Sequence, residues 1–145
     1  MSETKVLCPV TSLLEARVLV DLAIQRLPTL TTYGVGVYFE VYRQGREAVA
    51  RALAEGQAAL YDDSCLRMVA WCTDWLKLRR TRKTFNPYCT SYGYKHVVEN
   101  ACGDYISNGC FIAAALGLGL DFKIDGPNAI FKISDKRLPG VSDVR

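Results

Sequence analysis

Asn108-Gly-Cys-Phe-Ile-Ala-Ala-Ala-Leu-Gly-Leu-Gly119 is the stretch of sequence that decides the fold. Asn108 is a suitable N-terminal cap for a helix, and Gly117 and Gly119 are suitable residues at which it can end. Residues 110–116 are apolar on every face, and a helix that is apolar all round is normally buried. The stretch therefore predicts a core helix.

Four more helices are predicted from capping residues and from apolar residues at helical spacing. Ser12-Leu-Leu-Glu15 is a capping box that begins the first helix, and Pro28 ends it at about Leu27. The second helix is rich in alanine, the best helix former, and contains Gly56, at which it can kink. The four helices are expected over residues 12–27, 47–60, 64–80 and 90–103, with Ser64 capping the third and Gly103 ending the fourth.

Residues 31–43 fit two structures. Their β-branched and aromatic side chains favour a strand. The spacing of Val35, Tyr38, Phe39 and Tyr42 also fits a helix, although Gly34 and Gly36 weaken both assignments. We expect a helix, because the neighbouring segments are helical.

The C-terminal part contains a hairpin signal. Phe122-Lys-Ile124 and Ala129-Ile-Phe-Lys-Ile133 are short apolar runs around the turn Asp125-Gly-Pro-Asn128. The expected fold class is therefore mainly α, a compact multi-helix domain with a small C-terminal β-hairpin. Residues 1–145 are expected to form a single domain, a usual size for one. Residues 1–11 and 134–145 are expected to be loosely ordered.

The charge of the chain is mildly basic. The formal net charge is +3, from 18 basic and 15 acidic residues. This excludes a highly acidic DNA mimic, and it lies far from the strongly basic profile of many nucleic-acid-binding domains. Hydrophobic residues make up 50% of the chain, which is enough for a core and argues against disorder.

Six cysteines are present, at positions 8, 65, 72, 89, 102 and 110. We expect reduced thiols, because the N-terminal sequence MSETKVLCPV has no long apolar signal region leading to an oxidising compartment. No CxxC pair occurs, and His96 has no cysteine at zinc-finger spacing, so no metal site is predicted. No cofactor is predicted either, and the apolar stretches are too short to span a membrane.

Catalysis by an activated cysteine or serine would have to use His96, the one histidine. His96 lies three residues before Glu99 on a predicted helix, where a hydrogen bond between them accounts for both side chains. No carboxylate pair stands out, and no glycine-rich phosphate loop follows a strand. The chain is therefore predicted not to be an enzyme. A cysteine- or histidine-dependent hydrolase is the weakest alternative, because a second catalytic group is missing.

A run of cations follows the two tryptophans of the third predicted helix. Cations near a helix C-terminus offset its dipole by about 0.3–1 kcal/mol each, but this run exceeds what capping requires. Arginine binds oxyanions bidentately, so the run is a candidate docking patch for phosphates or an acidic protein surface. Trp71 and Trp75 are expected to be largely buried, although tryptophan beside arginine is typical of interface hot spots. The candidate partner-binding residues are Lys77, Arg79, Arg80, Arg82, Lys83 and Trp75.

The order of elements after residue 90 also fits a DNA-binding module. A helix, a short turn, a second helix and a hairpin match a helix-turn-helix with a wing. Lys123 and Lys132 of the hairpin can reach phosphate. The second helix argues against this reading, because residues 110–119 include no Arg, Lys, Asn or Gln to contact base edges.

Three segments resemble a pattern in small proteins of proteobacterial phages and other mobile elements, some associated with anti-CRISPR loci. The resemblance covers about residues 90–120, and Tyr92, Lys95, His96 and Glu99 within it can equally serve to lock two helices together. The segments are Ser91-Tyr92-Gly93-Tyr94-Lys95-His96-Val97-Val98-Glu99, Tyr105-Ile106-Ser107-Asn108-Gly109 and Phe111-Ile112-Ala113-Ala114-Ala115.

The resemblance implies a phage-encoded inhibitor of CRISPR interference acting in the cytoplasm of the bacterial host. Such an anti-CRISPR protein would act by stoichiometric binding to a class 1, type I effector complex or to its nuclease-helicase. The basic run at residues 77–83 would then contact an acidic patch of a Cas protein or the exposed backbone of the guide RNA. A winged-helix-like regulator that binds phage DNA is the alternative function, and a homodimer also remains open.

Overall fold

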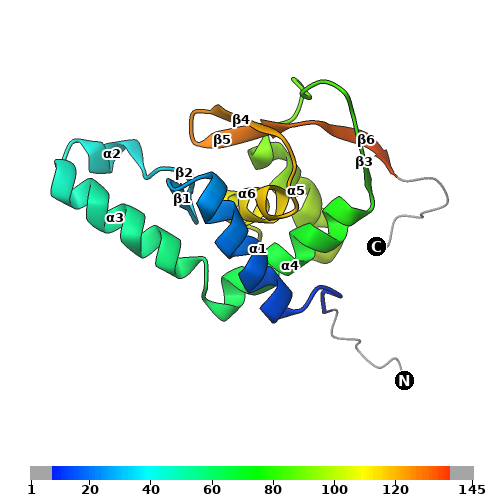
Figure 1. Ribbon diagram of the computed structural model, residues 1–145, viewed down its shortest axis with the longest axis horizontal. Coiled ribbons are helices and arrows are strands. Elements are labelled where there is room, and N and C mark those ends of the chain that lie inside the picture. Colours follow the sequence, from blue (N-terminus) through cyan, green and yellow to red (C-terminus); the bar gives the residue numbers. More distant parts are fainter. Residues whose placement is uncertain (1–7, 138–145) are drawn as a thin grey trace.

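The structure is a computed structural model, and it describes residues 8–137 of the chain. Its helices are α1 (Leu13–Arg26), α2 (Phe39–Tyr42), α3 (Arg46–Ala59), α4 (Asp63–Lys77), α5 (Ser91–Cys102) and α6 (Asn108–Gly117). Its strands are β1 (Leu30–Thr31), β2 (Gly34–Val35), β3 (Arg79–Thr81), β4 (Phe122–Asp125), β5 (Asn128–Phe131) and β6 (Ile133–Arg137). The strands form antiparallel pairs: β1 with β2, β3 with β6, and β4 with β5 (Figure 1). The fold is mainly α with a small hairpin near the C-terminus, as predicted.

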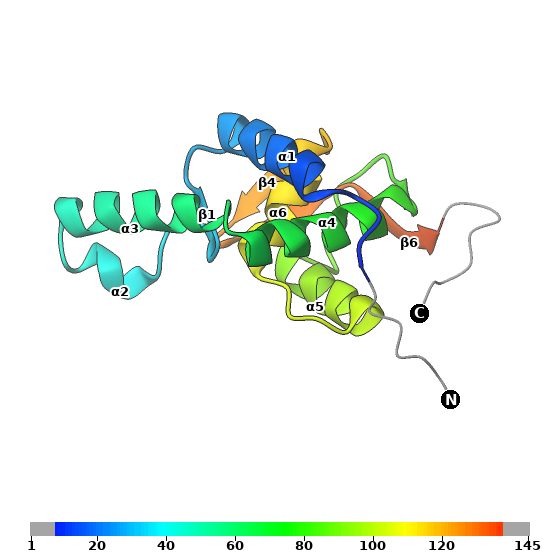
Figure 2. The same cartoon turned by 90° about the horizontal axis from the view of Figure 1, so that it is seen from below.

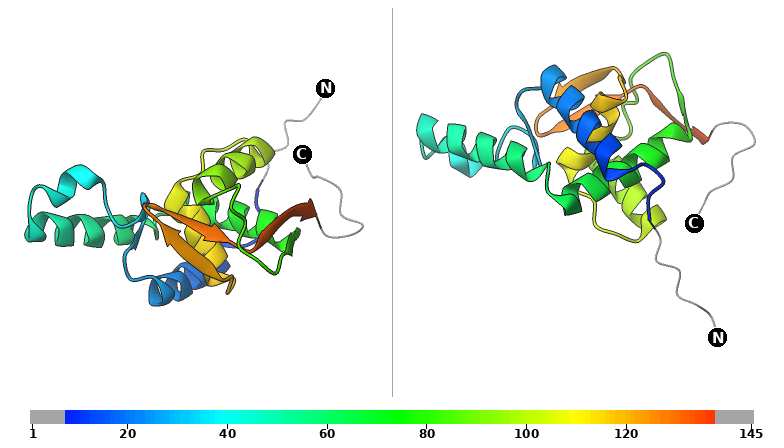
Figure 3. Two further views of the ribbon diagram at one scale, coloured as in Figure 1. Left: turned by 90° about the horizontal axis from the view of Figure 1, so that it is seen from above. Right: turned by 60° about the horizontal axis from the view of Figure 1, so that its bottom comes forward.

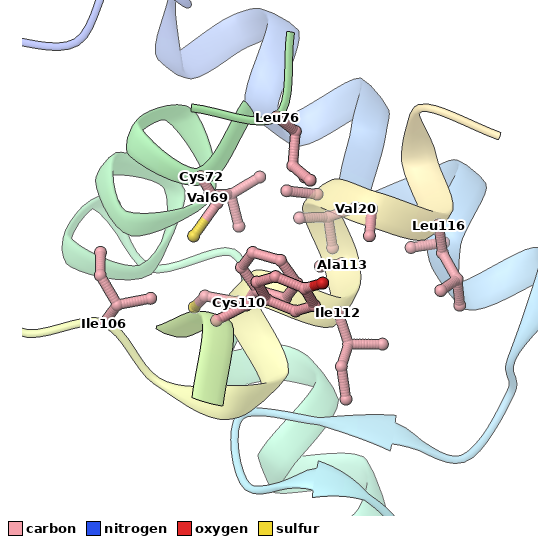
Figure 4. Packing of buried hydrophobic residues seen from close by; sticks show 14 of the residues in the cluster. Val20, Val69, Cys72, Leu76, Ile106, Cys110, Ile112, Ala113 and Leu116 are labelled. Carbon is pink, nitrogen blue, oxygen red and sulfur yellow. The ribbon is translucent and has the colours of Figure 1, made fainter. Parts of the chain in front are cut away.

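Helix α6 lies at the centre of the helical body, where it packs against α1, α4 and α5 (Figure 2). Residues 108–116 are all buried, which confirms the predicted core helix. Figure 4 shows Val20 of α1 and Val69 of α4 directed towards the cluster around Ala113. Removal of this apolar surface from water is the main contribution to the stability of the fold.

An aromatic group surrounds Phe111 of α6. The Tyr94 ring stacks on it with 5.5 Å between centroids, and Trp75 and Phe131 meet it edge-on at 6.2 and 5.9 Å. Such ring pairs contribute about 0.5–1.5 kcal/mol each beyond their burial. Because the four rings come from α4, α5, α6 and β5, they join the hairpin to the helices.

Two glycines allow α6 to approach its neighbours closely. A Cβ on Gly109 would lie 1.8 Å from the carbonyl oxygen of Thr31. A Cβ on Gly117 would lie 2.6 Å from the carbonyl oxygen of Leu19. Both positions therefore require glycine because of close backbone contact at the two ends of the core helix.

The β4–β5 hairpin lies over the helical body (Figure 3), with Phe122 opposite Phe131 and Asp125 opposite Asn128. Gly126 at its turn has φ +62°, a conformation that glycine adopts without strain. Phe131 is fully buried, so the predicted hairpin is confirmed and closes one side of the core.

Both ends of the described chain are held more firmly than the sequence predicted. Residues 134–137, expected to be loose, belong to β6 and pair with β3. The backbone N–H and the hydroxyl of Thr11 donate to Asp74 at 3.0 and 2.6 Å, and Thr11 is buried. The expectation of loose order is therefore wrong for these residues. For residues 1–7 and 138–145, the same expectation lies outside the described part of the chain.

Two predicted helix caps are displaced along the sequence. Ser107, rather than Asn108, caps α6, and its Oγ accepts from the Cys110 N–H at 3.1 Å. Asp62, rather than Ser64, is the N-cap residue of α4. Several neighbouring residues at each of these helix starts are suitable caps, so local preference alone does not select one of them. The displacement of the α6 cap leaves the Asn108 side chain available for contacts elsewhere.

Residues 31–43 do not form the helix that we expected. Leu30–Thr31 and Gly34–Val35 form a small hairpin, and only the single turn of α2 is helical. Gly34 and Gly36 have φ of +136° and +82°, which are incompatible with a right-handed helix. The two glycines therefore turn the chain and interrupt the helix that the spacing of the apolar residues predicted.

Helix α3 runs out from the helical body as an arm, with α2 folded against it (Figures 1 and 2). Neither helix contains a buried residue. Helix α3 is continuous from Arg46 to Ala59 and straight (Figure 1), so Gly56 does not kink it, contrary to the expectation from the sequence. A Cβ at Gly56 would lie 2.7 Å from the Cβ of Thr31, so this glycine provides room where α3 passes β1.

Candidate functional site

The cations predicted to bind a partner fall on two elements rather than on one helix. Lys77 is exposed in the last turn of α4, which ends there and not at Arg80 as predicted. Arg79–Thr81 instead form β3 and pair with β6. This long-range strand pairing overrides the helical spacing, and successive side chains of β3 consequently point to opposite faces.

Arg79 faces the core side of β3. Its guanidinium carbon lies 4.2 Å from the centroid of the Trp75 ring, and Trp75 is only 9% exposed. A partly desolvated cation over an indole face contributes about 1–2 kcal/mol. Trp75 and Arg79 thus pack on each other in the folded chain, and the predicted burial of Trp75 is confirmed.

The rest of the basic run lies at the surface, at Arg80, Arg82 and Lys83. Arg80 and Lys83 are exposed, and Arg82 is partly exposed. The backbone N–H of Arg82 donates to the carbonyl of Lys132 at 2.9 Å. This contact places the run beside the link between β5 and β6, so that cations far apart in the sequence share one surface.

Phe85 lies against two lysines of the hairpin. The Nζ atoms of Lys123 and Lys132 are 4.7 and 5.1 Å from the centroid of its ring. Lys132 also forms an ion pair with Asp121 at 3.0 Å, which offsets part of the local charge. We name the surface formed by Arg80, Arg82, Lys83, Lys123 and Lys132 the basic edge. Its residue types suit the binding of carboxylates or phosphates.

In the sequence the hairpin lysines lie about 40 residues or more from the basic run, and no pattern in the sequence predicts a role for Phe85. One signal was present, since Phe-Lys-Ile occurs twice around the turn, at 122–124 and 131–133. In the observed register Lys123 lies opposite Ile130, two residues before Lys132. The two lysines therefore share a face of the hairpin. Their nearness to Arg82 depends on tertiary contacts that no local pattern reveals.

Glu99 connects α5 to the segment before α6. Its Oε1 accepts from Lys95 Nζ at 2.8 Å and from the Ile106 N–H at 3.1 Å, and its Oε2 lies 2.9 Å from His96 Nδ1. Burial raises the pKa of Glu99, but these hydrogen bonds outweigh burial and lower it to about 2. The predicted contact between His96 and Glu99 is confirmed. Through Glu99, α5 is joined to the segment before α6, so these residues help to hold the two helices together.

The cysteines are free thiols. A hydrogen bond with the Cys110 thiol lowers the pKa of Cys65, and the same bond together with burial raises that of Cys110. The contacts of His96 are with Glu99 and with the Tyr92 ring, 4.8 Å between centroids. Within residues 8–137, therefore, no thiol–imidazole pair of the kind an activated nucleophile needs is assembled. The described residues also contain no group of three or more side chains suited to a metal ion.

Helix α6 is not placed as a recognition helix. Because residues 108–116 are buried beneath α1, α4 and α5, α6 cannot enter a major groove without unfolding the core. The order of elements that suggested a helix-turn-helix is present, but its second helix is the interior of the domain. Contact with nucleic acid would have to use another surface, such as the basic edge.

Comparison with known proteins found no match to a protein-family model, to a curated protein or to a solved structure. Among the helices in the described part of the chain, none has the length and apolar character needed to cross a membrane.

Proposed function

We propose that this chain acts by binding a macromolecular partner through the basic edge, as a stoichiometric inhibitor of class 1 CRISPR interference. Two contacts support binding through this surface. The backbone of Arg82 is hydrogen-bonded to Lys132, and the ammonium groups of Lys123 and Lys132 both lie over the Phe85 ring. The resemblance at residues 90–120 supports the choice of a type I effector complex or its nuclease-helicase. The proposed setting is the bacterial host cell.

The partner surface is proposed to be an acidic patch of a Cas protein. Arg80 and Lys83 are exposed and can reach carboxylates, which arginine binds through two parallel hydrogen bonds. The Phe85 ring holds the ammonium groups of Lys123 and Lys132 over its face, which lowers the entropy lost when these side chains bind. Phosphates of an exposed guide RNA offer similar chemistry, and nuclease treatment distinguishes the two.

The test is capture of a purified type I effector complex, and separately of its nuclease-helicase, by the immobilised chain. Capture should survive nuclease treatment of accessible RNA and DNA. The double charge reversal R80E/K83E should abolish it. The matched control is R46E/R51E, which makes the same change in net charge at two exposed positions of α3 and should leave capture intact.

Equal capture by R80E/K83E and by the unchanged chain would contradict a role for the basic edge. Capture that disappears after nuclease treatment would replace the acidic protein patch with a nucleic-acid contact. Salt-dependent binding to duplex DNA without capture of either Cas target would favour the regulator of phage DNA.

A further inference from the structure

A second candidate site lies at the base of the α2–α3 arm, facing the junction of α5 and α6. It is a cleft of about 520 Å³, within the size range of small-molecule sites. Its walls include Tyr33, Tyr38, Tyr92 and Tyr105, with Lys95 and Asn108 among its polar residues. We name it the tyrosine cleft. It is lined by no residue of the basic edge, so its role is independent of the proposed function.

The tyrosines present large aromatic surfaces. Tyr38 and Tyr105 are each 62% exposed, and the Tyr33 and Tyr38 rings contact each other with 4.1 Å between centroids. Exposed ring faces of this kind stack well on other planar groups. Because they come from the β1–β2 hairpin, the start of α2, α5 and the segment before α6, the cleft exists only in the folded chain.

The chain's own ammonium group already occupies the position that a bound cation would take. Lys95 Nζ lies 5.3 Å from the centroid of the Tyr92 ring and 4.8 Å from that of Tyr105. A cationic ligand would be repelled there. The Glu99 carboxylate pairs with Lys95 at 2.8 Å and neutralises it, so the cleft does not select an anion either. An uncharged planar group fits these conditions best.

Lys95 retains one donor for such a group. Its side chain is buried, and two of its ammonium hydrogens are used by Glu99 Oε1 at 2.8 Å and the Ile106 carbonyl at 3.0 Å. An ammonium has three donors. The third is therefore available to an acceptor atom of a ligand in the cleft.

Asn108 supplies an acceptor. The residue is only 7% exposed, and its Nδ2 donates to the carbonyls of Tyr33 and Pro127 at 3.3 and 3.2 Å and to Asn128 Oδ1 at 2.9 Å. Two backbone carbonyls fix which end of the amide is nitrogen, because carbonyls cannot donate. Within the described residues, Asn108 Oδ1 accepts no hydrogen bond. A buried acceptor of this kind is unfavourable unless a ligand supplies a donor.

We propose that the tyrosine cleft binds adenine or cytosine, the nucleobases whose base-pairing edge carries an exocyclic amine beside an unprotonated ring nitrogen. The base stacks on the tyrosine rings, its amine donates to Asn108 Oδ1, and its ring nitrogen accepts from Lys95. Uracil carries a carbonyl in place of the amine and would bring a second acceptor to Asn108. Because base pairing covers this edge, the ligand is a free nucleotide or an unpaired base in a single strand.

The test uses the full chain and short fluorescein-labelled oligonucleotides of A, C or U, in salt high enough to suppress phosphate contacts. Oligonucleotides of A and C should bind at least about tenfold more tightly than those of U. Competition by AMP or CMP, but not UMP, would assign the site to free nucleotides. Oligonucleotide binding that the monophosphates do not displace would assign it to single strands.

Variants connect this preference to the cleft. Tyr38→Ala and Tyr105→Ala should each weaken the binding of A and C oligonucleotides at least about tenfold, because stacking is lost, and their high exposure means that the core stays intact. Tyr88→Ala is the matched control, since Tyr88 is 90% exposed and does not line the cleft. R80E/K83E should leave the affinity for A and C oligonucleotides unchanged at this salt concentration, which separates this site from the basic edge. Absence of binding, equal affinity for A, C and U, or affinity for A and C that neither cleft variant weakens would overturn the proposal.

Discussion

The guanidinium of Arg79 stacks on the ring of Trp75, 4.2 Å from its centroid, whereas the next residue of β3, Arg80, is exposed. One short strand thus contributes a cation to the packing of the core and another to the surface. The run that looks uniform in the sequence therefore contains residues with different roles. Substitutions in it must be chosen individually, because loss of Arg79 would alter the fold as well as the charge.

Replacement of Arg79 by Ala should lower the free energy of unfolding by about 1–2 kcal/mol, because the cation–π contact with Trp75 is lost. Replacement of Arg80 by Ala should change it by less than about 0.5 kcal/mol, as expected for an exposed side chain. Urea unfolding followed by tryptophan fluorescence measures both. If the two substitutions lowered the free energy of unfolding equally, Arg79 could not be packed on Trp75 while Arg80 is exposed.

Gly109→Ala should destabilise the chain strongly. Its Cβ would lie 1.8 Å from the carbonyl oxygen of Thr31, and neither backbone can move without disturbing α6. A loss of about 3 kcal/mol or more is expected. Gly119→Ala is the control, since its Cβ would meet nothing within 4 Å and only its φ of +86° is unfavourable, at about 1 kcal/mol. A Gly109→Ala chain as stable as the Gly119→Ala chain would contradict the close contact between α6 and β1.

The stability of the chain should depend on pH through Glu99. Burial raises the pKa of this carboxyl, but hydrogen bonds from Lys95, the Ile106 N–H and His96 lower it to about 2, against about 4.3 when unfolded. The ionised carboxylate therefore stabilises the fold above about pH 4.3, and this contribution is lost as the pH falls towards 2. We expect a loss of about 2–3 kcal/mol across that window.

Urea unfolding at several pH values measures this effect, with Glu99→Gln as the comparison. The Gln variant should be less stable at neutral pH, because the buried Lys95 loses its carboxylate partner. Its stability should also fall less steeply between about pH 4.3 and 2. The same slope for both chains in that window would show that other carboxyl groups account for the acid sensitivity.

The backbone amides of α3 should exchange hydrogen with solvent much faster than those of α6. No residue of α3 is buried, and its main contacts are with the short elements α2 and β1. A helix of this length with so little tertiary packing is marginal in water. We expect its amides to exchange at least about 100-fold faster than those of α6, whose exchange requires opening of the core. Equal protection would mean that another surface covers α3 in solution. A second copy of this chain would then be the first candidate to test.

Elements with a strong local signal could be predicted from the sequence. α6 is apolar on every face, α1 begins at a capping box, and α5 ends at Gly103 with φ +81°. Each of these features lies within a few residues of the element that it specifies. The hairpin of β4 and β5 was predictable for the same reason, because its turn and both strands are adjacent in sequence.

Features that depend on distant residues could not be predicted in this way. β3 forms because β6 is beside it, and the basic edge exists because Arg82 contacts Lys132. The tyrosine cleft was missed because Tyr33 and Tyr38 belong to a segment expected to be helical, where they would not have faced α5. The sequence thus identified the basic residues but not which of them share a surface.

A plaque assay tests the central claim most directly. A targeted phage would be plated on a strain with active type I CRISPR immunity and on an isogenic strain without it, each expressing this chain, R80E/K83E or R46E/R51E. We predict that the unchanged chain and R46E/R51E restore plaques in the immune strain, and that R80E/K83E does not. No restoration against several type I systems would contradict the proposed function, and restoration by R80E/K83E would contradict the role of the basic edge.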